Sequence, residues 1–428
     1  MNDESAISVR SPWLPSTAEG WARGPVKYFF RIELGKMLQN APTSPHDREV
    51  PYLKAQHVQW GRVVVDELPT MWAPPNEIDA LRLICGDLLV CEGGEVGRCA
   101  TVTKTPPQDC IIQNALHRVR AKEGSDTRFL GYLLKHAADH GWFDVLCNRA
   151  TIAHFTVDKF GDVYIAIPSS SQQCAIADYL DRETGCINAV VEAKERWLEI
   201  LAEKRLAVVA GPVTRGLNPK APLRDSGISW LGEIPKHWDI ERSRWLFRER
   251  DERSVTGEEE LLTVSHLTGV TPRSEKNVNM FEAETTEGYK ICRKGDLVIN
   301  TLWAWMGAMG VAPQDGIVSP AYNVYTPCAA LDPAYIDALV RMPVFAQEVT
   351  RYSKGVWSSR LRLYPEGFFE VWFPVPPPEE QPAIVAHIEA ETRKLDALRM
   401  ATERTVALLK ERRAALVTAA VTGQLKVA

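Results

Sequence analysis

The sequence of 428 residues lacks several features that would place it in a definite class. It has no run of about 18 uncharged apolar residues, so we expect no membrane-spanning helix. Residues 1–30 carry charges and no apolar core, so we expect no secretory signal. The 9 cysteines form no C-x-x-C pair, and their spacing fits neither a zinc site nor a disulfide framework. These absences predict a reduced, cytoplasmic protein.

The chain also lacks an excess of positive charge, because 50 Lys and Arg residues stand against 55 Asp and Glu residues. Most domains that bind DNA are basic. The formal charge is −5, and no segment is a basic tail. A chain of this composition that binds DNA has to use local groups of cations or depend on a partner. The 45% of hydrophobic residues is ordinary for a globular protein, and the length predicts two or three domains.

Catalytic signatures are missing as well. His136 and His140 have the spacing of a zinc-protease helix, but no Glu follows the first histidine, so two polar residues on one helix face are the better interpretation. Glu192 and Lys194 match half of a nuclease site and lie on a coiled-coil ladder. The segment 319–322, SPAY, lacks the first residue and the second proline of the amino-methyltransferase motif. With no P-loop present, we predict no catalytic, nucleotide-binding or metal-binding residues.

What the chain does contain is an internal repeat. Residues 173–217 match residues 381–425 without a gap, at a separation of 208 residues. Further matches surround this one, for example Trp21 with Trp238 and Asp87 with Asp296. The repeat predicts two copies of one unit, each a globular part followed by a long helix.

Both repeated segments have the period of a coiled coil. The first ladder of seven-residue steps contains Leu180, Ile187, Leu201 and Val208 with Lys194 interrupting, and Ile388, Leu395, Leu409 and Leu416 with Thr402 interrupting. The second ladder contains Ile176, Val190 and Trp197 in one copy and Ile384 and Leu398 in the other. This pattern predicts two long helices that pair as an antiparallel coiled coil, with the globular parts at opposite ends. The alternative is an ordinary amphipathic helix packed on its own domain. Gly211-Pro212 and Gly423 are expected to stop the helices.

The globular parts are predicted to be mixed α/β sheet domains, so the fold class is α+β. Short β-branched runs at 62–66, 87–91, 163–167 and 296–300 predict strands, and 128–138 and 333–350 predict helices. The predicted segments are 1–165 and 223–372 for the two globular domains, and 166–222 and 373–428 for the two helical regions.

Four segments resemble a known family. The segment 227–238, GISWLGEIPKHW, resembles the start of a second target-recognition domain in the specificity subunit of type I restriction–modification enzymes. The segments 376–384, PPPEEQPAI, and 420–425, AVTGQL, resemble that family's distal conserved region, and 214–219, TRGLNP, resembles the end of its central conserved region. The resemblance covers essentially the whole chain. One departure is 169–173, SSSQQ, where Pro-Pro-x-Glu-Gln is usual.

The resemblance implies a non-catalytic reader of double-stranded DNA. Each target-recognition domain would read one half of a bipartite target, and the paired helices would act as a ruler and as docking sites for two modification subunits. Those subunits bind S-adenosylmethionine and methylate adenine at N6. Restriction subunits join them and use ATP and Mg²⁺. The family implies no cofactor in this chain.

Residues that read bases are sought on loops rich in Arg, Asn, Gln, Ser, Thr and His. Two loops at matching positions are candidates: Asn148, Arg149, Thr151 and His154 in the first copy, and Lys354, Trp357, Ser358, Ser359, Arg360 and Arg362 in the second. A second pair of turns contains Gly93, Gly94 and Arg98 in the first copy, and Trp303, Trp305 and Gly307 in the second. His117 and Asn323 also occupy matching positions, and Gln56, His57 and Gln59 are weaker candidates. The alternatives are a tight strand turn for the glycines and core packing for the two tryptophans.

Other functions remain open from the sequence. The chain is alternatively a stand-alone DNA-binding or DNA-bridging protein of the same fold, a coiled-coil scaffold that binds proteins, or an enzyme with an unrecognised site. Co-purification with a methyltransferase would distinguish the specificity subunit from all three.

Overall fold

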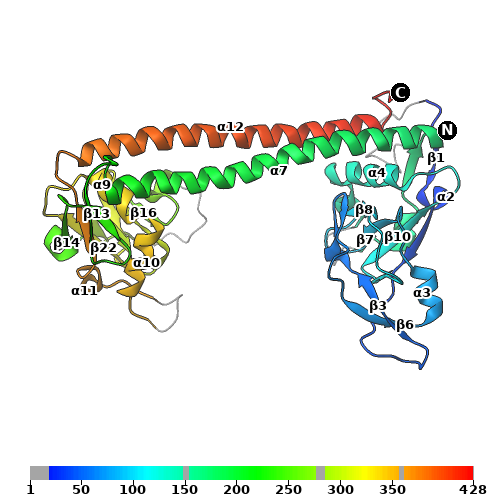
Figure 1. The fold of residues 1–428 in the computed structure, drawn as a ribbon, viewed down its shortest axis with the longest axis horizontal. Helices are drawn as coiled ribbons and strands as arrows, with labels where there is room; N and C mark the ends of the chain where they lie inside the picture. Colours follow the sequence, from blue (N-terminus) through cyan, green and yellow to red (C-terminus); the bar gives the residue numbers. More distant parts are fainter. Residues whose placement is uncertain (1–18, 148–153, 276–284, 356–360, 428) are drawn as a thin grey trace. The chain divides into compact units, whose positions relative to one another are not determined.

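The computed structural model describes residues 19–147, 154–275, 285–355 and 361–427. Its contacts divide the chain into two compact units. The first unit combines Met1–Lys194 with Arg404–Ala428, and the second is Glu195–Glu403. Each unit contains a sheet domain and part of both long helices, α7 (Ser170–Arg215) and α12 (Gln381–Val421) (Figure 1).

The sheet domain of the first unit is built from short strands and short helices. Its elements are β1 (Ala22–Pro25), α2 (Val26–Phe29), β2 (Phe30–Leu34), β3 (Arg48–Leu53), β4 (Val58–Gln59), β5 (Arg62–Val63), β6 (Thr70–Ala73), α3 (Pro75–Leu81), β7 (Leu88–Cys91), β8 (Cys99–Thr101), β9 (Ile111–Ile112), β10 (Leu116–Ala121), α4 (Thr127–Asp139), α5 (Trp142–Leu146), α6 (Val157–Gly161) and β11 (Tyr164–Ile167).

The central sheet of the first unit has the order β2-β10-β7-β8, and its neighbouring strands are antiparallel. In this register Val119 of β10 lies opposite Ile32 of β2 and Leu88 of β7. Helix α4 covers the sheet and lies between it and α7 (Figure 1). It begins at Asp126, whose carboxylate accepts a hydrogen bond from the backbone N–H of Arg128 over 2.7 Å. The apolar face of α4 therefore packs on the sheet and on the start of α7 in one core.

The second unit repeats this topology. Its elements are β12 (Leu223–Asp225), β13 (Glu233–Pro235), β14 (Asp239–Arg242), α8 (Ser243–Leu246), β15 (Phe247–Arg250), β16 (Leu262–Ser265), β17 (Gly269–Pro272), β18 (Lys290–Cys292), β19 (Leu297–Asn300), β20 (Met309–Val311), β21 (Gly316–Val318), β22 (Tyr322–Pro327), α9 (Pro333–Val340), α10 (Pro343–Arg351), α11 (Pro365–Phe368) and β23 (Trp372–Val375). This unit also contains the 3-10 turns η2 (Arg273–Glu275) and η3 (Ala304–Met306), whereas η1 (Ala55–His57) belongs to the first unit. The order β15-β22-β19-β20 matches the order in the first unit strand for strand.

A buried glutamine fastens each sheet domain to a long helix. Gln173 accepts from the N–H of Asp126 over 3.0 Å and donates to the carbonyl of Pro168 over 2.8 Å. Gln381, 208 residues later, accepts from the N–H of Asp332 over 2.6 Å and donates to the carbonyl of Pro376 over 2.9 Å. The internal repeat is therefore a repeat of individual contacts as well as of sequence.

The predicted antiparallel pairing of the long helices is confirmed within each unit. In the first unit, Ile187 and Val191 of α7 share an apolar cluster with Val406 of α12. In the second unit, Arg205 of α7 pairs with Asp396 of α12, with 3.2 Å between Nε and Oδ1. Residues later in α7 therefore contact residues earlier in α12, as antiparallel pairing requires.

The second predicted ladder was wrong along the middle of the helices. Val190 and Trp197 are each 45% exposed and Leu398 is 50% exposed, so they do not form the seam. The seam of α7 uses Thr184 and Val191 instead, one residue further along. A ladder through Val190 and one through Val191 both alternate steps of three and four residues with the first ladder, so the period of the sequence does not distinguish them. Packing against α12 decides which of the two is buried.

The expected stop at Gly211-Pro212 was also wrong, because α7 continues to Arg215 with Pro212 inside it. Proline removes one helical hydrogen bond. Here it lies in the last turn, and the fully buried Val213 holds that turn on the core of the second unit. Gly216, at φ +70, ends the helix. The expected stop of α12 at Gly423 is confirmed, with φ +74 at that residue.

Most of the predicted strands and helices are confirmed, with two differences. Only Arg62–Val63 of the segment 62–66 forms a strand, β5. The segment 333–350 forms two helices, α9 and α10, because Pro343 begins a new helix after Met342.

Candidate DNA interface

In the second unit, two of the predicted loops lie together. Lys354 and Arg362 form an isolated antiparallel bridge with two backbone hydrogen bonds of 2.9 Å. The next residue, Leu363, donates its N–H to the carbonyl of Thr301 over 3.1 Å. Thr301 begins the turn between β19 and β20. The bridge therefore fixes Lys354 and Arg362 beside that turn.

The turn between β19 and β20 exposes an aromatic ring. Trp303 is 50% exposed and stacks on Trp305, with ring centroids 6.3 Å apart and 17° between the planes. Gly307 closes the turn at φ +87, a conformation that favours glycine. Core packing therefore does not account for Trp303. Lys354 and Arg362 are exposed as well, and the bond from Leu363 to Thr301 joins their segment to this turn.

The first unit joins its two candidate loops in the same way. Phe155 donates its N–H to the carbonyl of Glu92 over 2.9 Å, and Glu92 begins the turn between β7 and β8. Phe155 and Leu363 are 208 residues apart, so the same hydrogen bond occurs in both units. The neighbouring His154 has a side chain that is 57% exposed, with Nδ1 3.9 Å from the carboxylate of Glu92.

The rest of the β7–β8 turn is mainly structural. Gly94 is exposed at φ +73, and Gly93 is half-buried. Arg98 is only 16% exposed in its side chain, because its guanidinium group donates to the carbonyl of Ala55 and to the carboxylate of Glu95, each over 3.0 Å. Arg98 therefore holds the turn in place rather than facing solvent.

His117 and Asn323 do not lie at the surface. His117 is fully buried, its Nε2 lies 2.6 Å from the carbonyl oxygen of Phe155, and burial lowers the pKa of its imidazole. Asn323 is 8% exposed and accepts from Lys290 over 3.4 Å. Their matching positions reflect equivalent places in two sheets, and neither side chain is presented to a duplex in the folded units.

The weaker candidates have local roles as well. His57 is buried, and its Nδ1 accepts from the N–H of Lys54 over 3.1 Å. Gln56 and Gln59 are both exposed. The remaining predicted contacts lie outside the described residues: Asn148, Arg149, Thr151, Trp357, Ser358, Ser359 and Arg360.

Two exposed side chains near these loops were missed in the sequence. Tyr364, 43% exposed, follows Arg362 by two residues. Leu267, 75% exposed, lies in the hairpin turn between β16 and β17. The sequence could have indicated Tyr364 as an aromatic residue just after a basic run. It could have indicated Leu267 as part of a short polar turn between two β-branched runs.

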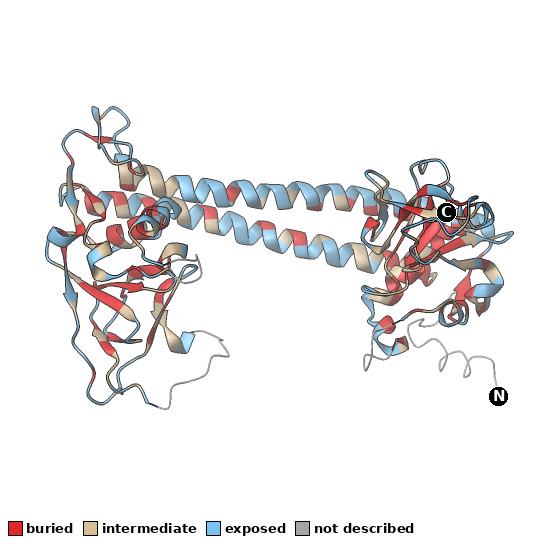
Figure 2. Ribbon diagram, turned by 90° about the horizontal axis from the view of Figure 1, so that it is seen from below, coloured by how far each residue is buried: buried red, intermediate tan, exposed pale blue. Residues whose placement is uncertain are grey.

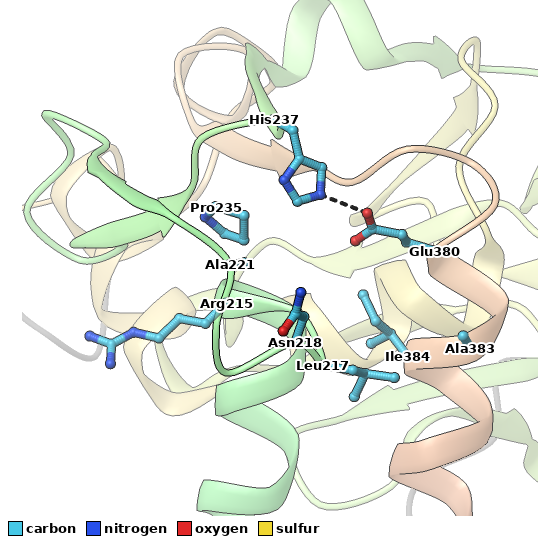
Figure 3. Close-up of a pocket in the computed structure, with 10 residues that line it drawn as sticks. Arg215, Leu217, Asn218, Ala221, Pro235, His237, Glu380, Ala383 and Ile384 are labelled. Carbon is cyan, nitrogen blue, oxygen red and sulfur yellow. Dashed lines mark hydrogen bonds and ion pairs between the residues drawn. The ribbon is translucent and has the colours of Figure 1, made fainter.

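A cavity of about 230 Å³ in the second unit lies where α7 ends and α12 begins. Figure 3 shows His237 facing Glu380, with 2.6 Å between Nε2 and Oε1, whereas Arg215 points away. Glu380 also accepts from Nε1 of Trp238 over 3.0 Å. This carboxylate therefore fastens the segment after α7 to the start of α12.

The described residues contain no group of three or more His, Cys, Asp and Glu side chains arranged to hold a metal ion. Burial raises the pKa of Cys110 and Cys292 to about 12, so both are neutral thiols at pH 7. Among the described helices, none combines the length and the apolar character needed to cross a membrane.

One family model matches part of the chain. Residues 20–195 match the family described as the type I restriction modification DNA specificity domain. No curated protein matches the chain.

Solved structures are similar over nearly the whole length. One is a chain from a structure that addresses complex assembly and conformational transition of the type I R-M system, with a TM-score of 0.69, 16% identity, and coverage of 96% of this chain and 100% of that one. Another is the HsdS subunit from Thermoanaerobacter tengcongensis, with a TM-score of 0.53, 16% identity, and coverage of 96% and 98%. Residues 20–195 are therefore similar to the type I restriction modification DNA specificity domain, and the chain as a whole has the fold of a solved HsdS subunit.

Proposed function

We propose that this chain is the non-catalytic specificity subunit of a type I restriction–modification complex and that each unit reads one half of a bipartite DNA target. The specificity domain at residues 20–195 supports the first reader. Repetition supports the second, because the sheet order and the hydrogen bond that joins the two candidate loops recur in the second unit. In this proposal the complex works in the cytoplasm.

The long helices are proposed to dock two modification subunits. The exposed ladder of α7 runs through Val190, Ala193, Trp197 and Ile200, and 208 residues later α12 has Leu398, Ala401, Thr405 and Leu408. Steps of three, four and three residues place each set on one helix face. We call these two sets the outer stripes.

The repetition of the outer stripes is the observation that carries the docking proposal. Val190 and Leu398 are 45% and 50% exposed, and Ile200 and Leu408 are 50% and 55% exposed. Figure 2 shows that exposed residues predominate along both long helices. Scattered exposed apolar residues are ordinary, but a repeated set at matching positions is not explained by chance exposure. Two like surfaces fit two copies of one partner.

The chemistry in this proposal belongs to the partners. Modification subunits would hold S-adenosylmethionine and methylate adenine, and restriction subunits would use ATP and Mg²⁺. The chain itself would supply DNA recognition and docking surfaces.

The docking proposal predicts a specific loss of partner. Ile200→Glu and Leu408→Glu place a charge at the last position of one outer stripe each, where burial of an unpaired charge against a partner is unfavourable. Each variant should co-purify with one modification subunit in place of two, and the double variant with none. The measurement is the mass of the complex in solution.

Leu206→Glu is the matched control. Leu206 is 51% exposed on the same helix, but it lies on another face and position 414 of the second copy is Ala. This variant should keep both partners. Full stoichiometry in the double outer-stripe variant would contradict the docking proposal, and a wild-type chain that captures no methyltransferase would contradict the subunit assignment.

A further inference from the structure

Each unit exposes an aromatic ring between two cations at the same place in its fold. The sets are Lys27, Tyr28 and Arg31 in the first unit, and Arg244, Trp245 and Arg248 in the second, 217 residues later. Tyr28 is 66% exposed and Trp245 is 70% exposed, and all four cations are exposed as well. We call each set a cation–aromatic turn.

The fold holds each turn with its apolar side inward. Val26 and Phe30 are buried on either side of the first turn, as Ser243 and Phe247 are in the second. The one-turn helices α2 and α8 therefore direct Tyr28 and Trp245 to solvent. A single exposed ring needs no explanation. Two rings at equivalent positions, each beside two cations, indicate a shared partner.

The cations of the turns exceed the carboxylates that pair with them. Glu33 is shared by Arg31 and the buried Arg118, and Glu370 is shared by Arg242 and Arg244. Burial, and then the nearby charges of Arg120 and Arg31, lower the pKa of Arg118 to about 10.

These pairs leave the cations available to another anion. Arg31 has a side chain that is 73% exposed and Lys27 one that is 54% exposed. Exposed ion pairs contribute little to stability, so exchange of a carboxylate for a phosphate is easy.

The turns lie beside the elements that follow the candidate DNA loops. Lys27 pairs with Asp162 over 2.6 Å at the end of α6, and Lys159 in α6 donates to the carbonyl of His154 over 3.2 Å. In the second unit, Arg244 donates to the carbonyl of Phe369 over 3.3 Å, just after α11. Within each unit, the turn is therefore linked through α6 or α11 to the segment proposed to read bases.

We propose that the two cation–aromatic turns contact the sugar–phosphate backbone of duplex DNA next to the half-sites. The inference rests on the proposed function, because it adds backbone contacts to the base-reading loops. Arginine and lysine pair with phosphates, and contacts to phosphate and sugar set position without reading sequence. The exposed ring packs on the deoxyribose. Duplex DNA is a partner that both units meet, and it offers the same backbone to each.

Binding of a mixed-sequence duplex to the full chain, measured across salt concentrations, tests this proposal. The double variant Arg31→Gln with Arg248→Gln should bind more weakly, and the slope of log affinity against log salt should fall by about 0.9 for each phosphate that is no longer neutralised. The double variant Tyr28→Ala with Trp245→Ala should bind more weakly at every salt concentration with the slope unchanged, because no counterion is released. All four side chains are exposed, so thermal unfolding should match the wild type.

Arg182→Gln is the control, because Arg182 is an exposed cation on α7 whose side chain is 65% exposed. It should leave affinity and slope unchanged. Unchanged affinity and slope in both double variants would overturn the inference, as would a loss confined to one target sequence. Unchanged DNA binding with loss of a protein partner would assign the turns to that partner instead. A wild-type chain that binds no duplex would contradict the proposed function itself.

Discussion

At the scale of single residues, matching polar side chains divide into buried fasteners and exposed contacts. Gln173 and Gln381 are buried and hydrogen-bonded to backbone groups, and Asp87 and Asp296 are buried and paired with arginines. His154 and its counterpart 208 residues later, Arg362, are both exposed. A repeated polar residue therefore indicates an equivalent position in two domains, and only burial tells whether that position is structural.

Gln173→Ala should destabilise the first unit. The change leaves the N–H of Asp126 and the carbonyls of Gly124 and Pro168 without their partner. A buried polar group without a partner costs about 1–3 kcal/mol, so we expect a loss of about 2–4 kcal/mol in the free energy of unfolding. Urea unfolding measures it. Gln172→Ala, at an exposed neighbour, should change stability by less than about 0.5 kcal/mol, and equal effects of the two substitutions would contradict the fastening role.

At the scale of elements, each unit joins a strand turn to a second segment by one backbone hydrogen bond. The bond from Leu363 to Thr301 fixes the end of the segment after α10 beside the turn of Trp303. The bond from Phe155 to Glu92 does the same in the first unit. Rigid positions of this kind suit base reading, since hydrogen bonds to base edges need fixed geometry.

Arg362→Ala tests the second of these surfaces. If the guanidinium group touches base edges, affinity should fall by about 1–3 kcal/mol and only one half of the target should become relaxed. If it touches phosphates, affinity should fall for all sequences with a smaller salt slope. Binding to a panel of duplexes with single base changes distinguishes the two outcomes.

Lys294→Ala is the matched control for Arg362. Lys294 is an exposed cation of the same unit, and it precedes β19, whereas the candidate turn follows that strand. Its loss should leave affinity and base preference unchanged. Unchanged binding by the Arg362 variant would remove this residue from the interface.

At the scale of the whole molecule, the last helix, α12, completes the hydrophobic core of the first unit. Val417, Ala420 and Val421 of α12 lie in the core that contains α4 and the start of α7. The second unit has the reverse arrangement, in which Val213 of α7 and Ile384 of α12 enter one core. Each sheet domain is therefore completed by the end of one long helix and the beginning of the other.

A chain that ends at Glu403 should lose the stability of the first unit and keep that of the second. Burial of a valine contributes about 1.5–3 kcal/mol, and whole domains are stable by only about 5–15 kcal/mol. Loss of Val417 and Val421 together is thus a large fraction of the total. Hydrogen exchange should show reduced protection in β7 and β10 and retained protection in β19 and β22. A separate peptide of residues 404–427 should restore protection of β7 and β10, and equal protection of both units without it would contradict this closure.

The sequence by itself determined the internal repeat, the two long helices, their antiparallel pairing and the mixed sheet domains. These features follow from local periodicity and from matches between two segments of one chain, and both are written along the sequence. The resemblance to a specificity subunit rested on short motifs of the same kind and agrees with the match of residues 20–195 to a DNA specificity domain.

Only the tertiary structure decided which residues face inward. The ladders of Val190 and Val191 differ by one position, and packing against α12 buries the second and exposes the first. In the same way, folding of the sheets buries His117 and Asn323 and leaves Trp303 in solvent. Burial depends on partners far away in the sequence, so no local pattern specifies it. The surfaces proposed here for DNA and for partner subunits are defined by that long-range packing.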